Sequence, residues 1–137
     1  EGFRKTLEFD PEHQRASTNL GALMIMRGRF VEAIPFLQKS AKLNPQNHGV
    51  HYNLGVAQLG ANKILVAIAS LKESLNINPT FIPAQLRLAE AYTRNMQFEK
   101  GIAIYEEILE AQPDHKTAGE KLKELRNRKG VDSGNPR

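Results

Sequence analysis

Apolar and polar residues follow one another along this chain with the spacing of amphipathic helices. In "ILVAIASLKESL", Ile64 is followed by apolar residues at intervals of 4, 3 and 4, which would place them on one helix face. Such runs are separated by short stretches with helix breakers, "RGRF", "GANK" and "RNMQF", and the longer segments end at prolines. The pattern predicts short helices joined in pairs by tight turns.

The prolines that end these segments are periodic. Pro11, Pro45, Pro79 and Pro113 follow one another at a constant interval. We let each unit begin three residues after a proline. This division predicts the tail of a preceding repeat, three helical hairpins, a terminal helix and a flexible end. It also predicts that a longer protein continues before Glu1. These segments are 1–13, 14–47, 48–81, 82–115, 116–129 and 130–137.

Equivalent places in the three units carry similar residues. The seventh is leucine, the eighth and twentieth are glycine or alanine, and the thirty-second is proline. A small residue lets two helix axes approach, so glycine inside a helix, which costs about 1 kcal/mol relative to alanine, predicts close packing there. The positions of this signature are Leu20, Gly21, Ala33 and Pro45, then Leu54, Gly55, Ala67 and Pro79, then Leu88, Ala89, Gly101 and Pro113.

These features give the chain a resemblance to a known family. The 34-residue spacing, the "NLG" at Asn19–Gly21 and at Asn53–Gly55, the aromatic residues Phe30 and Phe98 and the terminal prolines resemble tetratricopeptide repeats over residues 1–115. The resemblance implies an all-α fold, a right-handed α-solenoid of antiparallel helix hairpins closed by a capping helix. The usual bulky fourth residue is replaced by Ser17, His51 and Gln85, and Ile108 stands where a small residue is expected.

The resemblance also implies where a partner would bind. First helices of such repeats line a concave surface that holds an extended peptide or a helix of another protein. Positions 2, 5, 6, 9, 12 and 13 of each first helix would face it, and position 12 is Ile25, Leu59 and Thr93. The partner-binding residues expected from this geometry are Arg15, Thr18, Asn19, Tyr52, Asn53, Val56, Leu86, Arg87, Glu90 and Arg94.

Asn19, Asn53 and Arg87 share the sixth position and would form a ladder one repeat apart. An asparagine amide can bond a peptide backbone without reading its sequence, and an arginine can take a carboxylate in a fork. The alternative is that the asparagines bond only neighbouring turns of the protein. The ladder resembles in part the carboxylate clamp of chaperone-binding repeats, but Thr18, Ala22 and Pro83 replace its other residues, so we do not predict binding of chaperone tails.

Other chemistry finds little support in the sequence. His48 and His51 are three residues apart but lack a third metal ligand, and the acidic residues Glu106, Glu107 and Glu110 are expected to lie on a solvated helix face. The chain has no cysteine, nucleophile elbow, phosphate loop or dinucleotide fingerprint. We predict no catalytic residue, metal, cofactor or small-molecule substrate.

Composition and charge complete the prediction. The chain has 137 residues, 40% of them hydrophobic, and its apolar runs fall short of the roughly 20 residues that span a bilayer. We expect a soluble chain with no membrane span and leave its compartment open. The net charge is +4, equal to the surplus of six basic over two acidic residues in 116–129, so the sequence places the charge on the capping helix. Nucleic acid or an acidic membrane surface is an alternative partner there.

The sequence therefore predicts a protein-interaction scaffold without catalysis of its own. One alternative is a docking or regulatory segment of a larger enzyme. Another is an element that assembles with itself through an apolar N-terminal edge carrying Phe3, Leu7 and Phe9.

Overall fold

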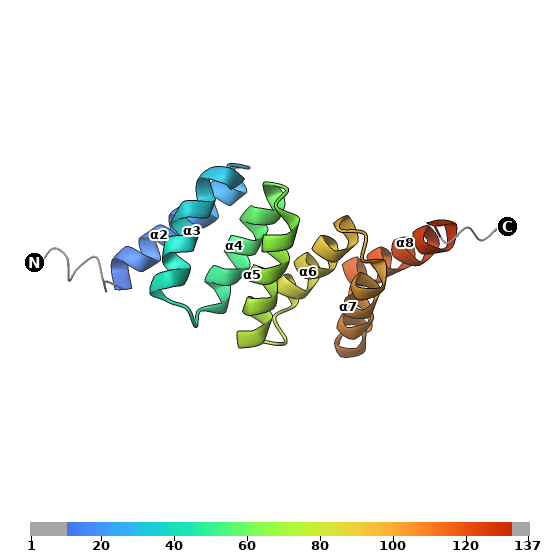
Figure 1. The fold of residues 1–137 in the computed structure, drawn as a ribbon. Helices are drawn as coiled ribbons and strands as arrows, with labels where there is room; N and C mark the ends of the chain where they lie inside the picture. Colours follow the sequence, from blue (N-terminus) through green and yellow to red (C-terminus); the bar gives the residue numbers. More distant parts are fainter. Residues whose placement is uncertain (1–10, 133–137) are drawn as a thin grey trace, which may run out of the picture. The chain divides into compact units, whose positions relative to one another are not determined.

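In a computed structural model of the protein, residues 11–132 are described, apart from the side chains of 11–15, 17 and 129–132. This part of the chain forms seven helices and no strand, which confirms the all-α fold of sequential hairpins (Figure 1). None of these helices is both long and apolar enough to cross a membrane. The helices are α2 (Pro11–Met26), α3 (Phe30–Leu43), α4 (His48–Gly60), α5 (Ile64–Ile77), α6 (Ile82–Arg94), α7 (Phe98–Ala111) and α8 (Lys116–Asp132).

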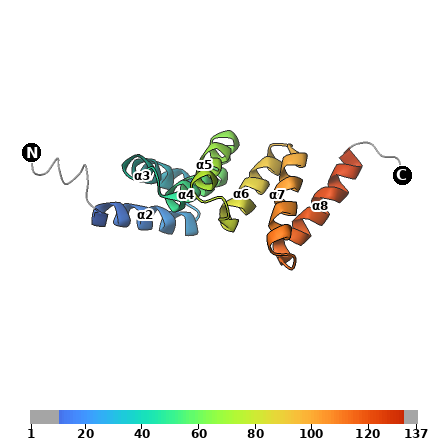
Figure 2. The same ribbon diagram turned by 90° about the horizontal axis from the view of Figure 1, so that it is seen from below.

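The chain divides into two compact units, Glu1–Pro79 and Thr80–Arg137. In the first unit, α2 with α3 and α4 with α5 form two successive hairpins, and α3 also packs against α4 (Figures 1 and 2). In the second unit, α6 and α7 form a hairpin and α8 packs against α7. We call α2, α4 and α6 the first helices and α3, α5 and α7 the second helices.

Most helix boundaries repeat with the predicted period. The second helices begin at Phe30, Ile64 and Phe98, each one full period after the last, and the starts of α4, α6 and α8 are spaced in the same way. The first helix departs from the expected start at residue 14, because proline fits the first turn of a helix, where its missing N–H would be unsatisfied anyway. The last helix continues past the expected end at residue 129, because a single glycine weakens a helix without ending it.

Glycines of the first helices hold the hairpins of the first unit together. A Cβ added at Gly21 would lie 2.7 Å from Leu37 Cδ2, and one added at Gly55 would lie 2.6 Å from Leu71 Cγ. Both leucines are fully buried, so neither has room to move aside. Since a methyl group cannot be accommodated without a shift, the cost of glycine in these helices is offset by close packing.

The second unit places its glycine in the other helix of the hairpin. Ala89 takes the repeat position of Gly21 and Gly55, and Gly101 takes the position of Ala33 and Ala67. A Cβ added at Gly101 would lie 2.9 Å from Thr93 Oγ1. The buried core around this crossing is formed by Ala89, Tyr105, Ile108, Ala118, Leu122 and Leu125.

Each hairpin turn contains one residue in the left-handed backbone region. These are Gly28, Asn62 and Met96, with φ of 76°, 64° and 63°. Glycine adopts this conformation without steric cost and asparagine tolerates it, whereas methionine does not favour it. From the first hairpin turn to the third, the residue at this place is therefore progressively less suited to the left-handed conformation.

The outward faces of α2 and α8 differ in character. Leu20, at the signature position of Leu54, is 39% exposed, because α3 covers this face of α4 and no described residue covers that of α2. On α8, Lys123 stands at the repeat position of Gly21 and Gly55, where a second helix would approach. The long charged side chain replaces the small residue that close packing requires.

Candidate functional site

The candidate site in the first unit is the face of α2 and α4 that carries the predicted contact residues. The two helices contact each other. Asn19 is exposed, and the other predicted residues with described side chains, Thr18, Tyr52, Asn53 and Val56, are partly exposed. Residues 16–26 and 48–60 contain no aspartate, glutamate, lysine or arginine, so the described part of the face is uncharged apart from two histidines. The side chain of Arg15 lies outside the described residues.

The two asparagines of this face keep their amides available. The side-chain amides of Asn19 and Asn53 make no hydrogen bond to the side chain or the backbone of another described residue. They lie one repeat apart on helices that touch. Each amide can therefore donate two hydrogen bonds and accept further ones from a ligand.

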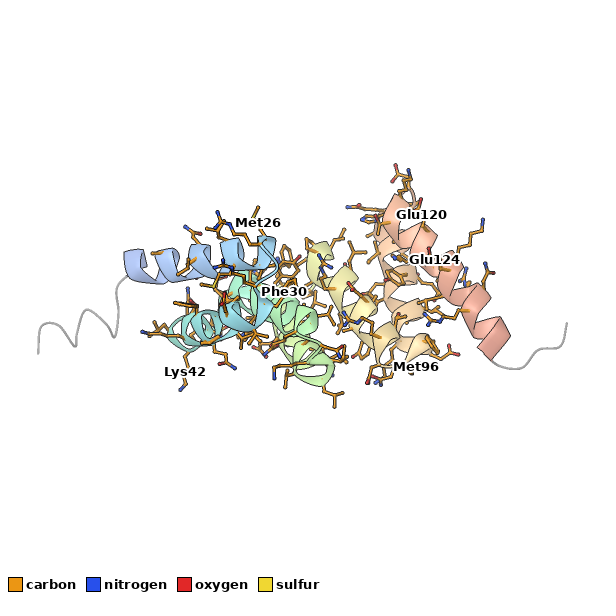
Figure 3. All side chains as sticks on the ribbon, turned by 90° about the horizontal axis from the view of Figure 1, so that it is seen from above. Met26, Phe30, Lys42, Met96, Glu120 and Glu124 are labelled. Carbon is orange, nitrogen blue, oxygen red and sulfur yellow. The ribbon has the colours of Figure 1, made fainter. Side chains whose placement is uncertain are left out.

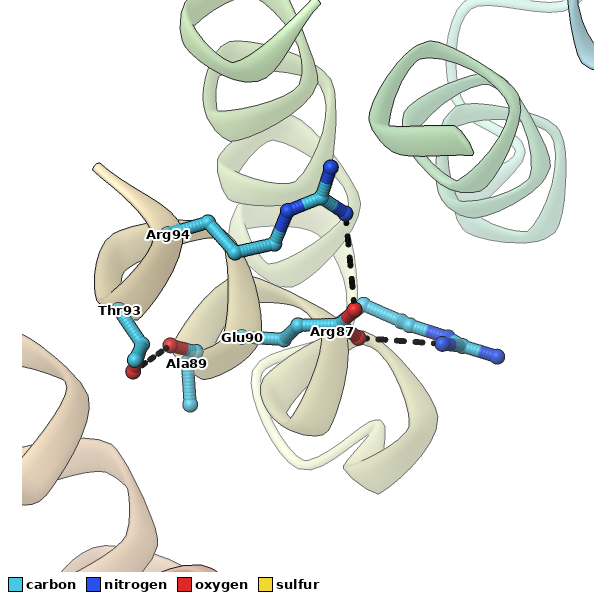
Figure 4. A network of polar contacts seen from close by, with 5 residues as sticks. All are labelled: Arg87, Ala89, Glu90, Thr93 and Arg94. Carbon is cyan, nitrogen blue, oxygen red and sulfur yellow. Dashed lines mark hydrogen bonds and ion pairs between the residues drawn. The ribbon is translucent and has the colours of Figure 1, made fainter. Parts of the chain in front are cut away.

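In the second unit the predicted residues form an ion-pair network on α6. Arg87 Nη1 donates to Glu90 Oε1 at 3.1 Å, and Arg94 Nη1 lies 3.7 Å from Glu90 Oε2 (Figure 4). The three side chains are each 39–45% exposed, so solvent screens the pairs and their contribution to stability is small. Arg87 is thus engaged by its own helix, in contrast to the free amides of Asn19 and Asn53.

Leu86 and Tyr105 connect this face of α6 with the core of the second unit. Leu86 is partly buried and packs against the core of the second unit. Tyr105 lies in that core, and its burial, followed by the nearby carboxylates of Glu90 and Glu124, raises the pKa of its hydroxyl to about 12. The hydroxyl therefore stays protonated at neutral pH and offers no proton for acid–base chemistry there.

The expectation that position 12 faces a partner is wrong. Leu59 is only 3% exposed, and Ile25 packs against the core of its hairpin. Thr93 Oγ1 donates to the Ala89 carbonyl at 2.8 Å and points away from the Arg87 and Glu90 side chains (Figure 4). The helix turns by about 100° per residue, so position 12 lies about 40° from position 8, which is buried in all three repeats, and about 60° from position 9.

The histidines serve the structure of the helix ends. Asn78 Nδ2 donates to His48 Nε2 at 3.3 Å, and His51 Nε2 lies 2.9 Å from the Pro45 carbonyl oxygen. His115 Nδ1 accepts from the Ala118 N–H at 3.1 Å and so caps the start of α8. Within residues 16–128, with the side chain of 17 left aside, no three histidine, aspartate or glutamate side chains gather closely enough to hold a metal ion.

The basic residues of α8 are largely matched by neighbours. Arg126 Nη2 donates to Glu106 Oε2 at 2.6 Å, Lys121 Nζ lies 3.9 Å from Glu124 Oε1, and Arg128 lies over the ring of Phe98. Residues 80–128 hold eight basic and eight acidic residues, so the described part of the second unit is neutral.

Sequence reasoning assigned the positive charge to the capping helix alone and missed a second surplus. Residues 16–79 contain six lysines and arginines against two glutamates, a surplus of four. Within residues 80–128 the acidic residues before α8 cancel the basic surplus of α8, so the net charge of the whole chain does not reveal where its excess lies. A count made hairpin by hairpin would have found the surplus of the first unit.

The comparisons with known proteins agree with this fold. Residues 59–125 match the tetratricopeptide repeat family, while none of the curated protein sequences compared matches the chain. The tetratricopeptide repeat domain of OM64 from Arabidopsis is similar, with a TM-score of 0.80 and 22% identity over 85% of this chain and 97% of that one.

Two other solved structures show the same likeness. The first tetratricopeptide repeat domain of Spaghetti (RPAP3), bound to the HSP90 peptide SRMEEVD, has a TM-score of 0.82 and 21% identity, covering 88% of this chain and 96% of that one. MamA has a TM-score of 0.83 and 24% identity, covering 94% of this chain and 75% of that one. With its period, its hairpins and this match, the chain is a tetratricopeptide repeat protein.

Proposed function

We propose that the chain binds a segment of another protein on the exposed face of its first helices, without catalysis of its own. The observation that carries the proposal is the pair of unbonded amides of Asn19 and Asn53, one repeat apart on touching helices. Their lack of partners in the described structure argues against the alternative that they serve only to bond neighbouring turns.

The choice of asparagine at these places supports a ligand role. Asparagine inside a helix is less favourable than alanine or leucine, because its amide competes for backbone hydrogen bonds. A position that keeps an asparagine without using its amide internally gains nothing in stability from it. Hydrogen bonds from the amides to a peptide backbone, with Tyr52 and Val56 beside them, would account for both asparagines.

The partner segment in the first unit is held by hydrogen bonds and apolar contact, since the described part of the face has no aspartate, glutamate, lysine or arginine. In the second unit, an acidic group of the partner would replace Glu90 as the ligand of Arg87 or Arg94. The peptide in the RPAP3 structure ends in EEVD. Only Asn53 and Arg87 of this chain match the clamp that the resemblance implies for such tails, so we propose a different peptide as the ligand.

The proposal is tested with peptides selected from a random display library against the unmodified protein. Asn53→Ala and Asn19→Ala should each weaken the selected peptide by about tenfold, the value of one lost hydrogen-bonding amide. Asn76→Ala is the matched control, because Asn76 is an exposed asparagine on the second helix α5. Unchanged affinity in both face variants, with circular dichroism unaltered, would reject the proposal.

A second function is favoured by the uncovered apolar face of α2. Leu20 and Leu23 are 39% and 43% exposed at the repeat positions of Leu54 and Ala57, which are buried. We propose that a second copy of the chain covers this face; Phe3, Leu7 and Phe9 of the predicted edge lie outside the described residues. Light scattering at rising concentration should show association that Leu23→Ser abolishes, and a monomer throughout would reject it.

A further inference from the structure

The positive charge of residues 16–79 is confined to one layer of the first unit. All six lysines and arginines of this segment lie on the second helices or in the turns that lead into them, and all six are exposed. Of these six residues only Arg29 pairs with a described acidic side chain, at 3.8 Å from Glu32, and both partners are more than 60% exposed. The six residues are Arg27, Arg29, Lys39, Lys42, Lys63 and Lys72.

The same layer exposes large apolar side chains. Val31 and Leu65 stand one repeat apart and are 66% and 69% exposed, and Val66 beside them is 48% exposed. The corresponding residues of the second unit are Glu99 and Lys100. A cationic surface that also exposes aliphatic side chains is therefore a feature of the first unit alone among the described residues.

Helical spacing gathers these residues on one side of each second helix. Residues 31, 35, 38 and 42 of α3 recur at intervals of 4, 3 and 4 and are all exposed, as are residues 65, 69, 72 and 76 of α5. The buried residues Ala33, Leu37, Ala67 and Leu71 point the opposite way. Lys42 accordingly points out from α3 on the side away from α2 (Figure 3).

Contacts within the unit bring the two apolar ends together. The ring of Phe30, the first residue of α3, fills the space beside Gly60, the last residue of α4. This places the turn before α3 next to the turn before α5. Val31 and Leu65, each one residue into its helix, therefore lie at the same end of the unit, flanked by Arg29 and Lys63.

We propose that this basic face of the first unit, formed by the six cations with Val31, Leu65 and Val66, binds the surface of an anionic phospholipid bilayer. Lysines and arginines are attracted to anionic headgroups, and aliphatic side chains among them gain by entering the headgroup boundary. Nucleic acid would use the cations but leave the aliphatic side chains without a favourable contact. The face is separate from the uncharged face of α2 and α4, so lipid and a peptide can be bound together.

The test is flotation of the full chain with vesicles of phosphatidylcholine alone or with about one third phosphatidylserine. We expect binding only to the anionic vesicles, and less of it when the salt rises from about 0.05 M to about 0.3 M. Lys72→Gln should weaken binding roughly fivefold, and Leu65→Ser about tenfold. Both residues are exposed, so the fold should be retained.

Matched controls come from the second unit. Lys116→Gln removes the same charge as Lys72→Gln, and Met96→Ser removes an apolar side chain that is 67% exposed, as Leu65 is 69% exposed. Neither control should change vesicle binding by more than about twofold. Equal losses in controls and face variants, equal binding to neutral vesicles, or binding of duplex DNA without binding of vesicles would each overturn the proposal.

Discussion

The two units of this protein build the same hairpin crossing from opposite choices of residue. In the first unit the first helix supplies glycine and the second supplies alanine, as at Gly55 and Ala67; in the second unit the pair is reversed, as Ala89 and Gly101. The partner side chains differ accordingly, with Leu71 over Gly55 and Thr93 against Gly101. The crossing therefore requires two small residues, while the packing nearby decides which helix carries the glycine.

The units also differ in how they arrange charge. The second unit pairs its charges on the surface, as in Arg126 with Glu106 and Arg87 with Glu90. The first unit has no lysine, arginine, aspartate or glutamate in residues 16–26 and 48–60 of its first helices, and it gathers cations on the second helices and the turns before them. A shared backbone template thus carries one unit that pairs its charges internally and one with two chemically distinct faces.

The largest effect is expected from filling the crossing of the first unit. Ala67 is fully buried, so Ala67→Phe should lower the free energy of unfolding by about 3 kcal/mol or more through overpacking. Urea denaturation followed by circular dichroism measures the loss. The exposed Lys72→Ala should change stability by less than about 0.5 kcal/mol. Similar losses in both variants would show that the small residue does not control the crossing.

A smaller effect is expected at the glycine of the second unit. Gly101→Ala gains helix propensity but brings a methyl group to 2.9 Å from Thr93 Oγ1, so we expect a net loss of about 1 kcal/mol. Thr93→Ala removes that oxygen, and the double variant should recover most of the loss. Additive losses in this double-mutant cycle would mean that Thr93 is not the reason for the glycine.

A substitution in a hairpin turn is expected to raise the free energy of unfolding by a similar or smaller amount. Met96→Gly should stabilise the protein by up to about 1 kcal/mol, because it removes a side chain from the left-handed region while Met96 itself is 67% exposed. The expected rise appears in the same denaturation experiment. Gly28→Ala in the first unit should have the opposite sign, and a loss in Met96→Gly would contradict the comparison of the turns.

The smallest effect at neutral pH belongs to Tyr105. Its pKa is raised from 10.0 to about 12 in the folded protein, so the folded state holds the hydroxyl proton more tightly than the unfolded state. The stability that it contributes is complete below about pH 10 and is lost as the pH rises from there through about pH 12. Tyr105→Phe should unfold with a shallower pH dependence in this window than the unmodified protein, and parallel curves would contradict the assignment.

The sequence predicted the fold well because its signals are local and repeated. Prolines, turn residues and apolar spacing recur once in every repeat, and helices begin where the period places them at Ile64 and Ile82. The first helix of the described chain departs from the repeat pattern, for reasons that the period itself does not contain. Pro11 begins a helix instead of preceding one, and Leu20 is exposed because the face that would cover it has no described counterpart.

The candidate site was less predictable, because it depends on which side chains find partners. Asn19, Asn53 and Arg87 occupy one repeat position, but only the structure shows Arg87 bonded to Glu90 and the two amides unbonded. Positions beside the hairpin interior, such as Leu59, cannot be separated from surface positions by counting residues alone. The basic layer was overlooked because the surplus of residues 116–129 alone equals the net charge of the whole chain.

Lys123 has a consequence for how this protein could grow by gene duplication. A further hairpin appended beyond α8 would need to bring a helix against a lysine at the place where Gly21 and Gly55 admit one. A copy of the unit inserted ahead of Lys116 would meet only small residues at that place. Lengthening of the array is therefore easier ahead of α8 than at the place on α8 where Lys123 stands.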